Sequence, residues 1–192
     1  MNRLVFRLAA FARAPLVMAL FCLASVPVTR AALTTRVIAP VVTDPAITNG
    51  NPLFRHWVYL DINRPPAGKL FVFLPGTGGP PNAYRLILET AAQAGCHAVG
   101  LAYVNEQEVN AELCLGQPAT CAGEVRLENV TGADTSPLLD VNRANSIENR
   151  LIKLLEYLHR QFPAEGWGAF LTGGQPRWEL VAVSAYASTE PL

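Results

Sequence analysis

The sequence carries no net charge, because 15 lysine and arginine residues balance 15 aspartate and glutamate residues. A neutral chain gives no electrostatic reason to expect a nucleic-acid partner or an anionic membrane surface. Metal-ligand spacing is missing as well, since there is no C-x-x-C and no histidine close to the cysteines at 114 and 121. We therefore predict no metal, no cofactor and no nucleic acid. The hydrophobic content of 51% is enough for the core of one globular domain.

A phosphate-binding pattern is also absent from the glycine-rich segment Pro75–Gly79. It lacks G-x-x-x-x-G-K, and Pro81 stands where G-x-G-x-x-G needs glycine. Pro80 and Pro81 also remove N–H groups that a phosphate cradle would use. Two interpretations stay open: the glycines relieve strain in a tight strand-to-helix turn, or backbone N–H groups form an oxyanion hole for acyl transfer. The candidate oxyanion-hole residues are Thr77, Gly78 and Gly79.

Residues 1–32 have the pattern of a secretory signal peptide. Arginines precede the apolar run 16–23, which is too short to span a bilayer comfortably, and small residues follow it. An uncleaved membrane anchor stays open as the alternative, because Pro27 and Arg30 blur the cleavage site. We predict an exported protein, periplasmic or secreted, that meets a membrane only through an uncleaved signal.

Three cysteines lie beyond that segment. Cys114 and Cys121 share one polar loop and are close enough in the sequence to form a disulfide, which an exported protein can retain. Closing so short a loop would contribute about 2.5 kcal/mol in the chain-entropy model. Cys96 falls at the start of a strand pattern, where we expect it to be a small buried hydrophobe.

The rest of the chain alternates between strand and helix patterns. Residues 33–55 are rich in proline, threonine and asparagine and are expected to form an extended lead-in. The predicted strands are 56–60, 69–74, 97–104 and 178–184, and the predicted helices are 80–94 and 145–162. Apolar strands separated by helices are typical of a parallel, doubly wound α/β sheet, and this is the predicted fold class.

Residues 105–144 interrupt this rhythm. They are polar, contain the two loop cysteines and show no sustained period, so we expect an excursion over the strand ends, where α/β enzymes usually build a substrate entrance. The helix that follows has the clearest pattern in the chain. Asn145 and Glu148 fit a capping box, and apolar residues recur at helical spacing from Ile147 to Phe162.

Four segments with matching strand and helix patterns occur in a fixed order. They are Leu74–Gly79, the helix from Asn145, Phe162–Trp167 and Trp178–Ser184. This order resembles the α/β-hydrolase superfamily, in particular exported bacterial serine-hydrolase-like proteins, over about residues 55–184. The resemblance implies a hydrolase-type sheet and a lineage of acyl hydrolysis. In such proteins the last segment leads into a Gly-His-Ser-Gln-Gly turn that carries the nucleophile.

The sequence departs from that pattern at the nucleophile. Residues 185–189 read Ala-Tyr-Ala-Ser-Thr where Gly-x-Ser-x-Gly belongs, so Ala187 occupies the nucleophile position. Ser184 and Ser188 are nearby hydroxyls, but neither falls at the tip of the turn. The acid and the histidine follow the serine in this superfamily, whereas the three histidines of this chain all precede residue 184. We therefore predict no intact catalytic set.

Three functions remain open. The favoured one is a truncated, catalytically inactive member of an exported serine esterase or acyl-hydrolase family, with a partial hydrolase domain over residues 56–192, incomplete on its C-terminal side. The second is a non-enzymatic binding or interaction protein of the cell envelope. The third is an active esterase that uses Ser184 or Ser188. The expected partners are at most a small ester-like ligand and a second copy, because an apolar strand without a neighbour favours self-association.

Overall fold

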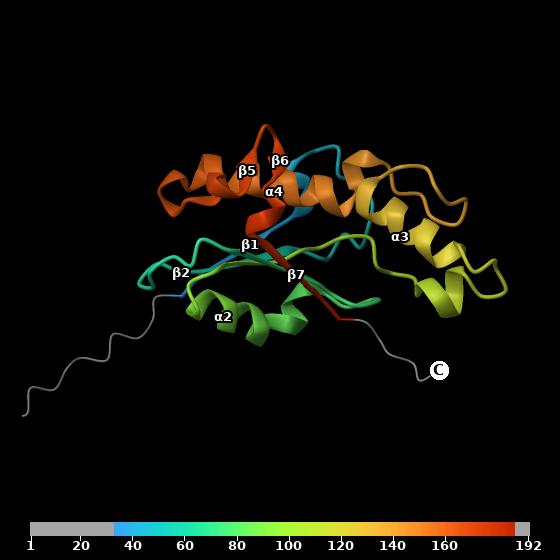
Figure 1. Cartoon of the computed structure of the whole chain (residues 1–192), viewed down its shortest axis with the longest axis horizontal. Coiled ribbons are helices and arrows are strands. Elements are labelled where there is room, and N and C mark those ends of the chain that lie inside the picture. Colours follow the sequence, from blue (N-terminus) through green and yellow to red (C-terminus); the bar gives the residue numbers. More distant parts are fainter. Residues whose placement is uncertain (1–32, 187–192) are drawn as a thin grey trace, which may run out of the picture. The chain divides into compact units, whose positions relative to one another are not determined.

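The computed structural model describes residues 33–186; the predicted signal peptide 1–32 and residues 187–192 lie outside the described part. A five-stranded sheet in the order β1-β2-β4-β3-β7 forms its centre (Figure 1). The strands are β1 (Leu33–Ile38), β2 (His56–Asp61), β3 (Leu70–Leu74), β4 (His97–Gly100) and β7 (Val181–Ala185). A separate pair consists of β5 (Leu171–Thr172) and β6 (Gln175–Pro176).

Helices cover both faces of the five-stranded sheet. The α-helices are α1 (Pro40–Thr43), α2 (Arg85–Gln93), α3 (Cys121–Thr131) and α4 (Ile147–Gln161). In Figure 1, α2 lies below the sheet and α4 lies above it, with α3 beside α4. Among residues 33–186, no helix combines the length and the apolar character needed to cross a membrane.

The prediction of a parallel, doubly wound sheet of hydrolase type is wrong, because the sheet is mixed. β2 runs antiparallel to both of its neighbours, β1 and β4, while β3 runs parallel to β4 and to β7. The physical reason lies in the connections. Two parallel neighbours need a long crossover that usually contains a helix, whereas residues 62–69 join β2 to β3 by a helix-free loop that reverses the chain. The prediction ignored that difference and assigned every strand one direction.

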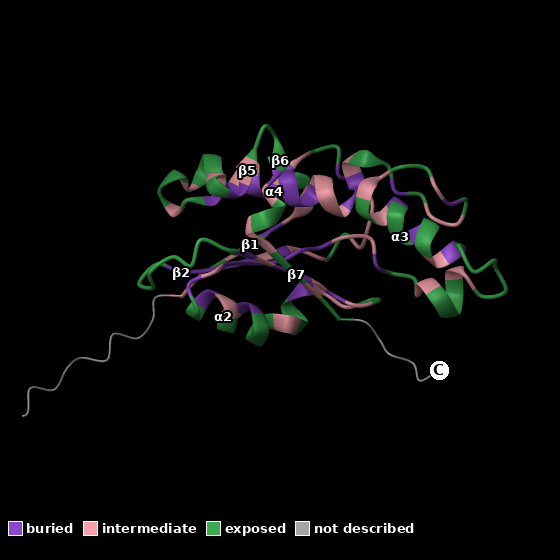
Figure 2. Cartoon of the chain, in the orientation of Figure 1, coloured by how far each residue is buried: buried purple, intermediate pink, exposed green. Residues whose placement is uncertain are grey.

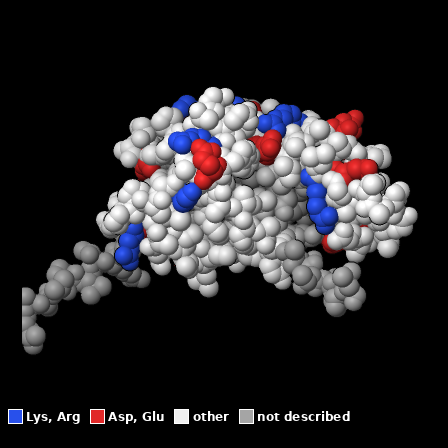
Figure 3. Space-filling view, viewed as in Figure 1, with Lys and Arg blue, Asp and Glu red and all other residues white. Residues whose placement is uncertain are grey.

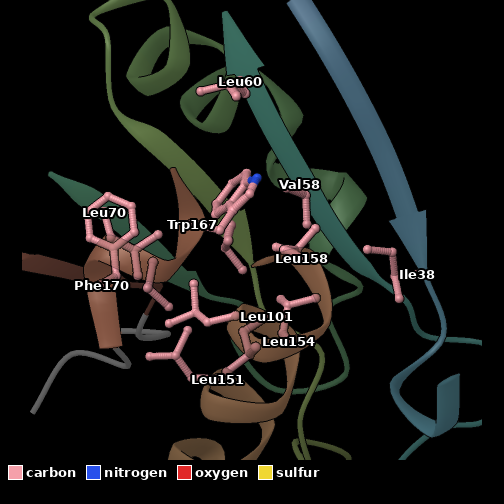
Figure 4. Close-up of a cluster of buried hydrophobic side chains, with 13 residues drawn as sticks. Ile38, Val58, Leu60, Leu70, Leu101, Leu151, Leu154, Leu158, Trp167 and Phe170 are labelled. Atoms are coloured by element: carbon pink, nitrogen blue, oxygen red, sulfur yellow. The ribbon is translucent and has the colours of Figure 1, made fainter. Parts of the chain in front are cut away.

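The main hydrophobic core lies between the sheet and α4 (Figure 4). Strand residues such as Val58 and Leu70 meet Leu154 and Leu158 of the helix, and Trp167 from the following turn closes one end. Figure 2 shows the buried residues concentrated where α4 faces the sheet. Burial of each such large apolar side chain contributes about 1.5–3 kcal/mol, so this layer is the main source of stability. A smaller core, which includes Phe73 and Leu88, lies between the sheet and α2.

The start of α4 differs from its prediction by one residue. Ser146 is the N-cap, and its hydroxyl accepts a hydrogen bond from the N–H of Asn149 at 3.2 Å. Asn145 is buried just before the cap, and its Oδ1 accepts the N–H groups of Thr48 and Asn49 at 2.9 and 2.8 Å. Asn145 therefore joins the loop before β2 to the start of α4 instead of capping the helix.

Regular structure also appears in both segments that were predicted without it. The lead-in contains α1 and β1, which pairs with β2 along its whole length. The excursion contains α3, whose buried Glu128 carboxylate accepts three backbone N–H groups of the loop that follows. These donors are Thr135 at 3.1 Å, Ser136 at 2.8 Å and Val141 at 3.1 Å. Glu128 therefore organises the loop that leads back toward α4.

Candidate functional site

Three neighbouring parallel strands, β4, β3 and β7, end at the same edge of the sheet. The connection from β3 to β4 passes through α2 on one face, and the path to β7 passes through α4 on the other face (Figure 1). In open α/β sheets, ligands bind outside the carboxyl ends of strands where the connections diverge in this way. A cavity of about 310 Å³ lies at this position, and we call it the strand-end cavity.

The wall of the strand-end cavity is built from two loops, two helices and the end of β7. The loop after β3 contributes Gly76 and Thr77, and the last described residues contribute Ala185 and Tyr186. The remaining lining residues used below are Tyr103, Glu108, Val109, Val125, Arg126, Asn129, Val130 and Ile147. The excursion 105–144 therefore supplies one side of the cavity.

Of the three oxyanion-hole candidates, only Thr77 has a backbone N–H that makes no other hydrogen bond within residues 33–186. The N–H of Gly78 donates to the carbonyl of Asn105 at 2.7 Å, and the N–H of Gly79 donates to the carbonyl of Gly76 at 2.9 Å. The N–H of Thr77 has no hydrogen-bond partner within residues 33–186, and Thr77 lines the cavity. An oxyanion hole usually presents two or more donors to the same oxygen, so the loop offers half of such a site.

Asn105 holds the glycine-rich loop in this shape. Its side-chain amide donates to the carbonyls of Gly76 and Gly79 at 2.7 and 3.1 Å. The residue is buried, and its Oδ1 has no hydrogen-bond partner in the described part of the chain. Asn105 was missed as a structural determinant, although its position directly after an apolar strand is a signal for a polar residue at a strand end.

Two of the three glycines of the loop also have structural reasons to be glycine. Gly78 has a φ of +65°, which favours a residue without a Cβ. A Cβ on Gly76 would lie 2.9 Å from Cδ1 of Tyr186, so glycine allows the end of β7 to approach the loop. The strain-relief interpretation of this loop therefore rests on observed geometry at both positions.

Two half-buried polar side chains border the cavity. The hydroxyl of Tyr103 donates to the carbonyl of Pro75 at 2.5 Å, and burial raises the pKa of Tyr103 to about 12. The side-chain amide of Asn129 donates to the carbonyl of Val104 at 2.8 Å, which leaves its buried Oδ1 without a partner among residues 33–186. The Oδ1 of Asn129 is enclosed by the protein and not open to a ligand, and Tyr103 stays protonated at neutral pH.

Two side chains of opposite charge, Glu108 and Arg126, line the cavity. Glu108 is partly exposed, and hydrogen bonds from the backbone, first of all from the N–H of Ala111, hold its pKa below the usual value. The positive charge of Arg126 acts in the same direction. Both side chains line the cavity, so a ligand meets one charge of each sign near the solvent.

Among the described residues, the hydroxyl candidate Ser184 lies outside the lining of this cavity. Ser184 lies on the same face of the sheet as Ala182, because side chains alternate along a strand. It lines a groove together with Phe73 and Tyr84 on the side of α2. Neither a histidine nor a carboxylate is among the described residues that line that groove. Ala187 and Ser188 lie outside the described residues.

The histidines near the sheet are distant from Ser184. His56 opens β2, three strand positions from β7, which corresponds to about 14 Å. Its Nδ1 accepts the N–H of Ala102 at 3.1 Å, and burial together with the charge of Arg150 lowers the pKa of His56 to about 3. His97 lies two strand positions from β7 and approaches the carbonyl of Glu165 at 2.6 Å, and burial lowers its pKa.

The remaining candidates concern cysteines and metals. Cys114 and Cys121 form a disulfide that joins the turn at Val109–Leu113 to the start of α3. Cys96 is a free thiol and only half-buried, because it lies just before β4 and not inside it. Within the part of the chain that the structure describes, no three metal-ligating side chains lie together.

Comparisons with known proteins add no family to these observations. Neither the protein-family models nor the curated proteins nor the solved structures contain a match to this chain.

Proposed function

We propose that this chain is a catalytically inactive relative of exported serine hydrolases, and that its strand-end cavity binds a small ester-like ligand without cleaving it. The observation that carries this proposal is the separation between the cavity and the hydroxyl of Ser184. The cavity is lined by α3 and by Ile147 of α4, whereas Ser184 lines the groove beside α2. A ligand bound against the loop after β3 therefore stays on the other side of β7 from that hydroxyl.

The lining of the cavity fits a short acyl ester. A carbonyl oxygen of the ligand can accept the N–H of Thr77. Val125 and Val130 from α3, together with Ile147, offer an apolar surface for a short hydrocarbon chain. A volume of about 310 Å³ is at the lower end of ligand pockets, which favours a small molecule.

The proposal includes export to the periplasm or the medium. The pattern of residues 1–32 carries this part of it. The disulfide between Cys114 and Cys121 is consistent with an oxidising compartment, because cytosolic thiols are kept reduced. An interaction role without a small ligand is the second candidate, and it rests on the exposed face of β7 around Val183.

The test combines binding and turnover measurements on the folded chain. We expect methyl butyrate to show saturable binding by ligand-observed NMR, with a Kd of about 1 mM for so small a molecule. The Val109→Trp variant should abolish this binding because the indole fills the cavity. Val37→Trp is the matched control, since Val37 is an exposed valine of β1 outside that cavity, and it should bind normally.

Two results would overturn the proposal. One is the absence of saturable binding to folded protein, or equal binding by the Val109→Trp variant. The other is covalent labelling by a fluorophosphonate probe that disappears in Ser184→Ala or Ser188→Ala, which would establish an active esterase. We expect that methyl butyrate binds and that the fluorophosphonate probe does not label the protein.

A further inference from the structure

A second cavity, of about 300 Å³, lies between the loop that precedes β2 and the start of α4. Its lining shares only Tyr103 with the strand-end cavity. Apolar contacts come from residues before β2, which include Pro40, Val41, Ile47 and Phe54. The charged lining residues are Arg55 and Arg150, and no described carboxylate lines this cavity. We call it the arginine cavity.

Arg150 is the buried charge of this cavity. The residue is 2% exposed, yet its partners are neutral oxygens. Nε donates to the carbonyl of Asn145 at 2.7 Å, Nη1 donates to the carbonyl of Ala102 at 3.3 Å, and Nη2 donates to the carbonyl of Asn49 at 2.5 Å. A weaker contact of 3.5 Å joins Nη2 to Oδ1 of Asn145. These bonds join three segments of the chain, but none of them neutralises the positive charge.

The buried charge is costly in this state. Burial lowers the pKa of Arg150 to about 10, and the only opposing carboxylate influence, from Glu106, is not an ion pair. Charges removed from water usually have a counter-charge in hydrogen-bond contact. His56 does not add positive charge, because its own pKa is lowered to about 3. An anion in the arginine cavity would supply the missing counter-charge.

Arg55 brings a second guanidinium to the same cavity. Its Nη1 donates to the carbonyls of Pro52 and Phe54 at 2.6 and 2.9 Å. Its Nε and Nη2 have no hydrogen-bond partner among residues 33–186, so they can donate to a ligand. The guanidinium fork of arginine matches the two oxygens of a carboxylate.

We infer that the arginine cavity is a binding site for a small organic carboxylate with a short apolar chain. The carboxylate group lies between the guanidinium groups of Arg55 and Arg150, and the chain lies against Val41, Ile47 and Phe54. An inorganic anion would use the charges but leave the apolar wall without a partner. This inference is independent of the ester-binding proposal, because the two linings share only Tyr103 and the ligand is an anion and not a neutral ester.

The experiment is a calorimetric titration of the full chain with sodium hexanoate. We expect saturable binding, with hexanol inactive because it lacks the charge and with sulfate at least about tenfold weaker because it lacks the chain. Arg55→Gln should weaken hexanoate binding by about tenfold or more, since hydrogen bonds to an ionised group are strong. The matched control is Arg85→Gln on α2, which makes the same charge change outside the cavity and should bind normally.

A purely structural role of Arg150 predicts a different outcome. Arg150 could act only as a connector of three carbonyls, in which case hexanoate would show no saturable binding to the folded chain. Equal affinity of the parent and Arg55→Gln would also overturn the inference, as would equal binding of hexanol. Val41→Trp gives a second readout that leaves both arginines in place, and it should abolish hexanoate binding by filling the cavity.

Discussion

β3 and β7 lie side by side in parallel, but only β3 is part of the interior. Val72 and Val183 are register partners, and they are 2% and 56% exposed. β3 has a strand on both sides and lies between α2 and α4, whereas β7 pairs only with β3 among residues 33–186. The sequences Leu-Phe-Val-Phe-Leu and Val-Ala-Val-Ser-Ala are both apolar enough for a buried strand. The number of packed neighbours therefore decides burial here, more than the composition of the strand.

The sharpest test of this comparison is the same substitution at both register partners. Val72→Ala should lower the free energy of unfolding by about 2.5 kcal/mol, because it removes two buried methyl groups and leaves a cavity. Val183→Ala should change it by less than about 0.5 kcal/mol, because the side chain is mostly in solvent. Urea denaturation at neutral pH measures both values.

Equal losses at the two positions would break the comparison. That result would mean that the outer face of β7 is covered in solution, by another copy or by residues outside 33–186. Repeating the denaturation of Val183→Ala at several protein concentrations separates these cases. A second copy makes the loss depend on concentration, whereas intramolecular cover does not.

The interior should also differ from β7 in its response to acid. His56 is fully buried at the start of β2, and its pKa of about 3 lies below its unfolded value of 6.5. Between pH 3 and pH 6.5, His56 therefore binds a proton in the unfolded chain but not in the folded chain. The free energy of unfolding keeps its full value above pH 6.5. It decreases as the pH falls toward 3, by about 1.4 kcal/mol per pH unit for one group. His97, whose pKa is also lowered by burial, acts in the same direction.

Chemical denaturation between pH 7.5 and 4.5 measures this slope. His56→Asn should flatten it, because the amide oxygen can still accept the N–H of Ala102 but no proton is taken up. His159→Asn is the control, since His159 is exposed on α4, and it should leave the slope unchanged. A His56→Asn variant with the parent slope would show that another group controls the acid response.

The helix α4 could be predicted because its apolar residues repeat with one period and face one core. Its cap could not be placed exactly, since Asn145 and Ser146 are both good caps and only the tertiary contacts of Asn145 with Thr48 and Asn49 separate them. The helix α3 was missed because its buried face includes Glu128, a residue whose burial depends on three loop N–H groups that no local pattern reveals.

The site shows the same division between local and distant information. The glycine-rich loop was recognisable at Gly76 and Gly78, because turn chemistry is local. The loss of the Gly78 donor was not, since it depends on the carbonyl of Asn105, which lies about 27 residues further along the chain and is folded back onto the loop. The arginine cavity was also invisible, because Arg55 and Arg150 are distant in the sequence and Arg150 lies on a helix whose pattern predicts only a core.

Placing a charge on the exposed face of β7 should have the smallest effect on stability. It is also the most direct test of whether this edge strand mediates self-association. Unprotected apolar edge strands pair with other chains, and charged residues are the usual protection. Figure 3 shows almost no charged side chains over the region of β7 and α2 on the face in view. β1, the opposite edge, instead carries Arg36, which forms an ion pair with Glu165 at 2.5 Å. We therefore expect the chain to self-associate through β7 and not through β1.

Sedimentation velocity over a range of protein concentrations separates the two edges. Val183→Lys should shift the distribution toward monomer and change the free energy of unfolding of the monomer by less than about 0.5 kcal/mol. Val37→Lys places the same charge at a similarly exposed valine of β1 and should leave self-association unchanged. If the parent chain stays monomeric at all concentrations, the expected self-association through β7 is wrong. Loss of association in both variants would instead point to general charge repulsion, because the two lysines share only their charge.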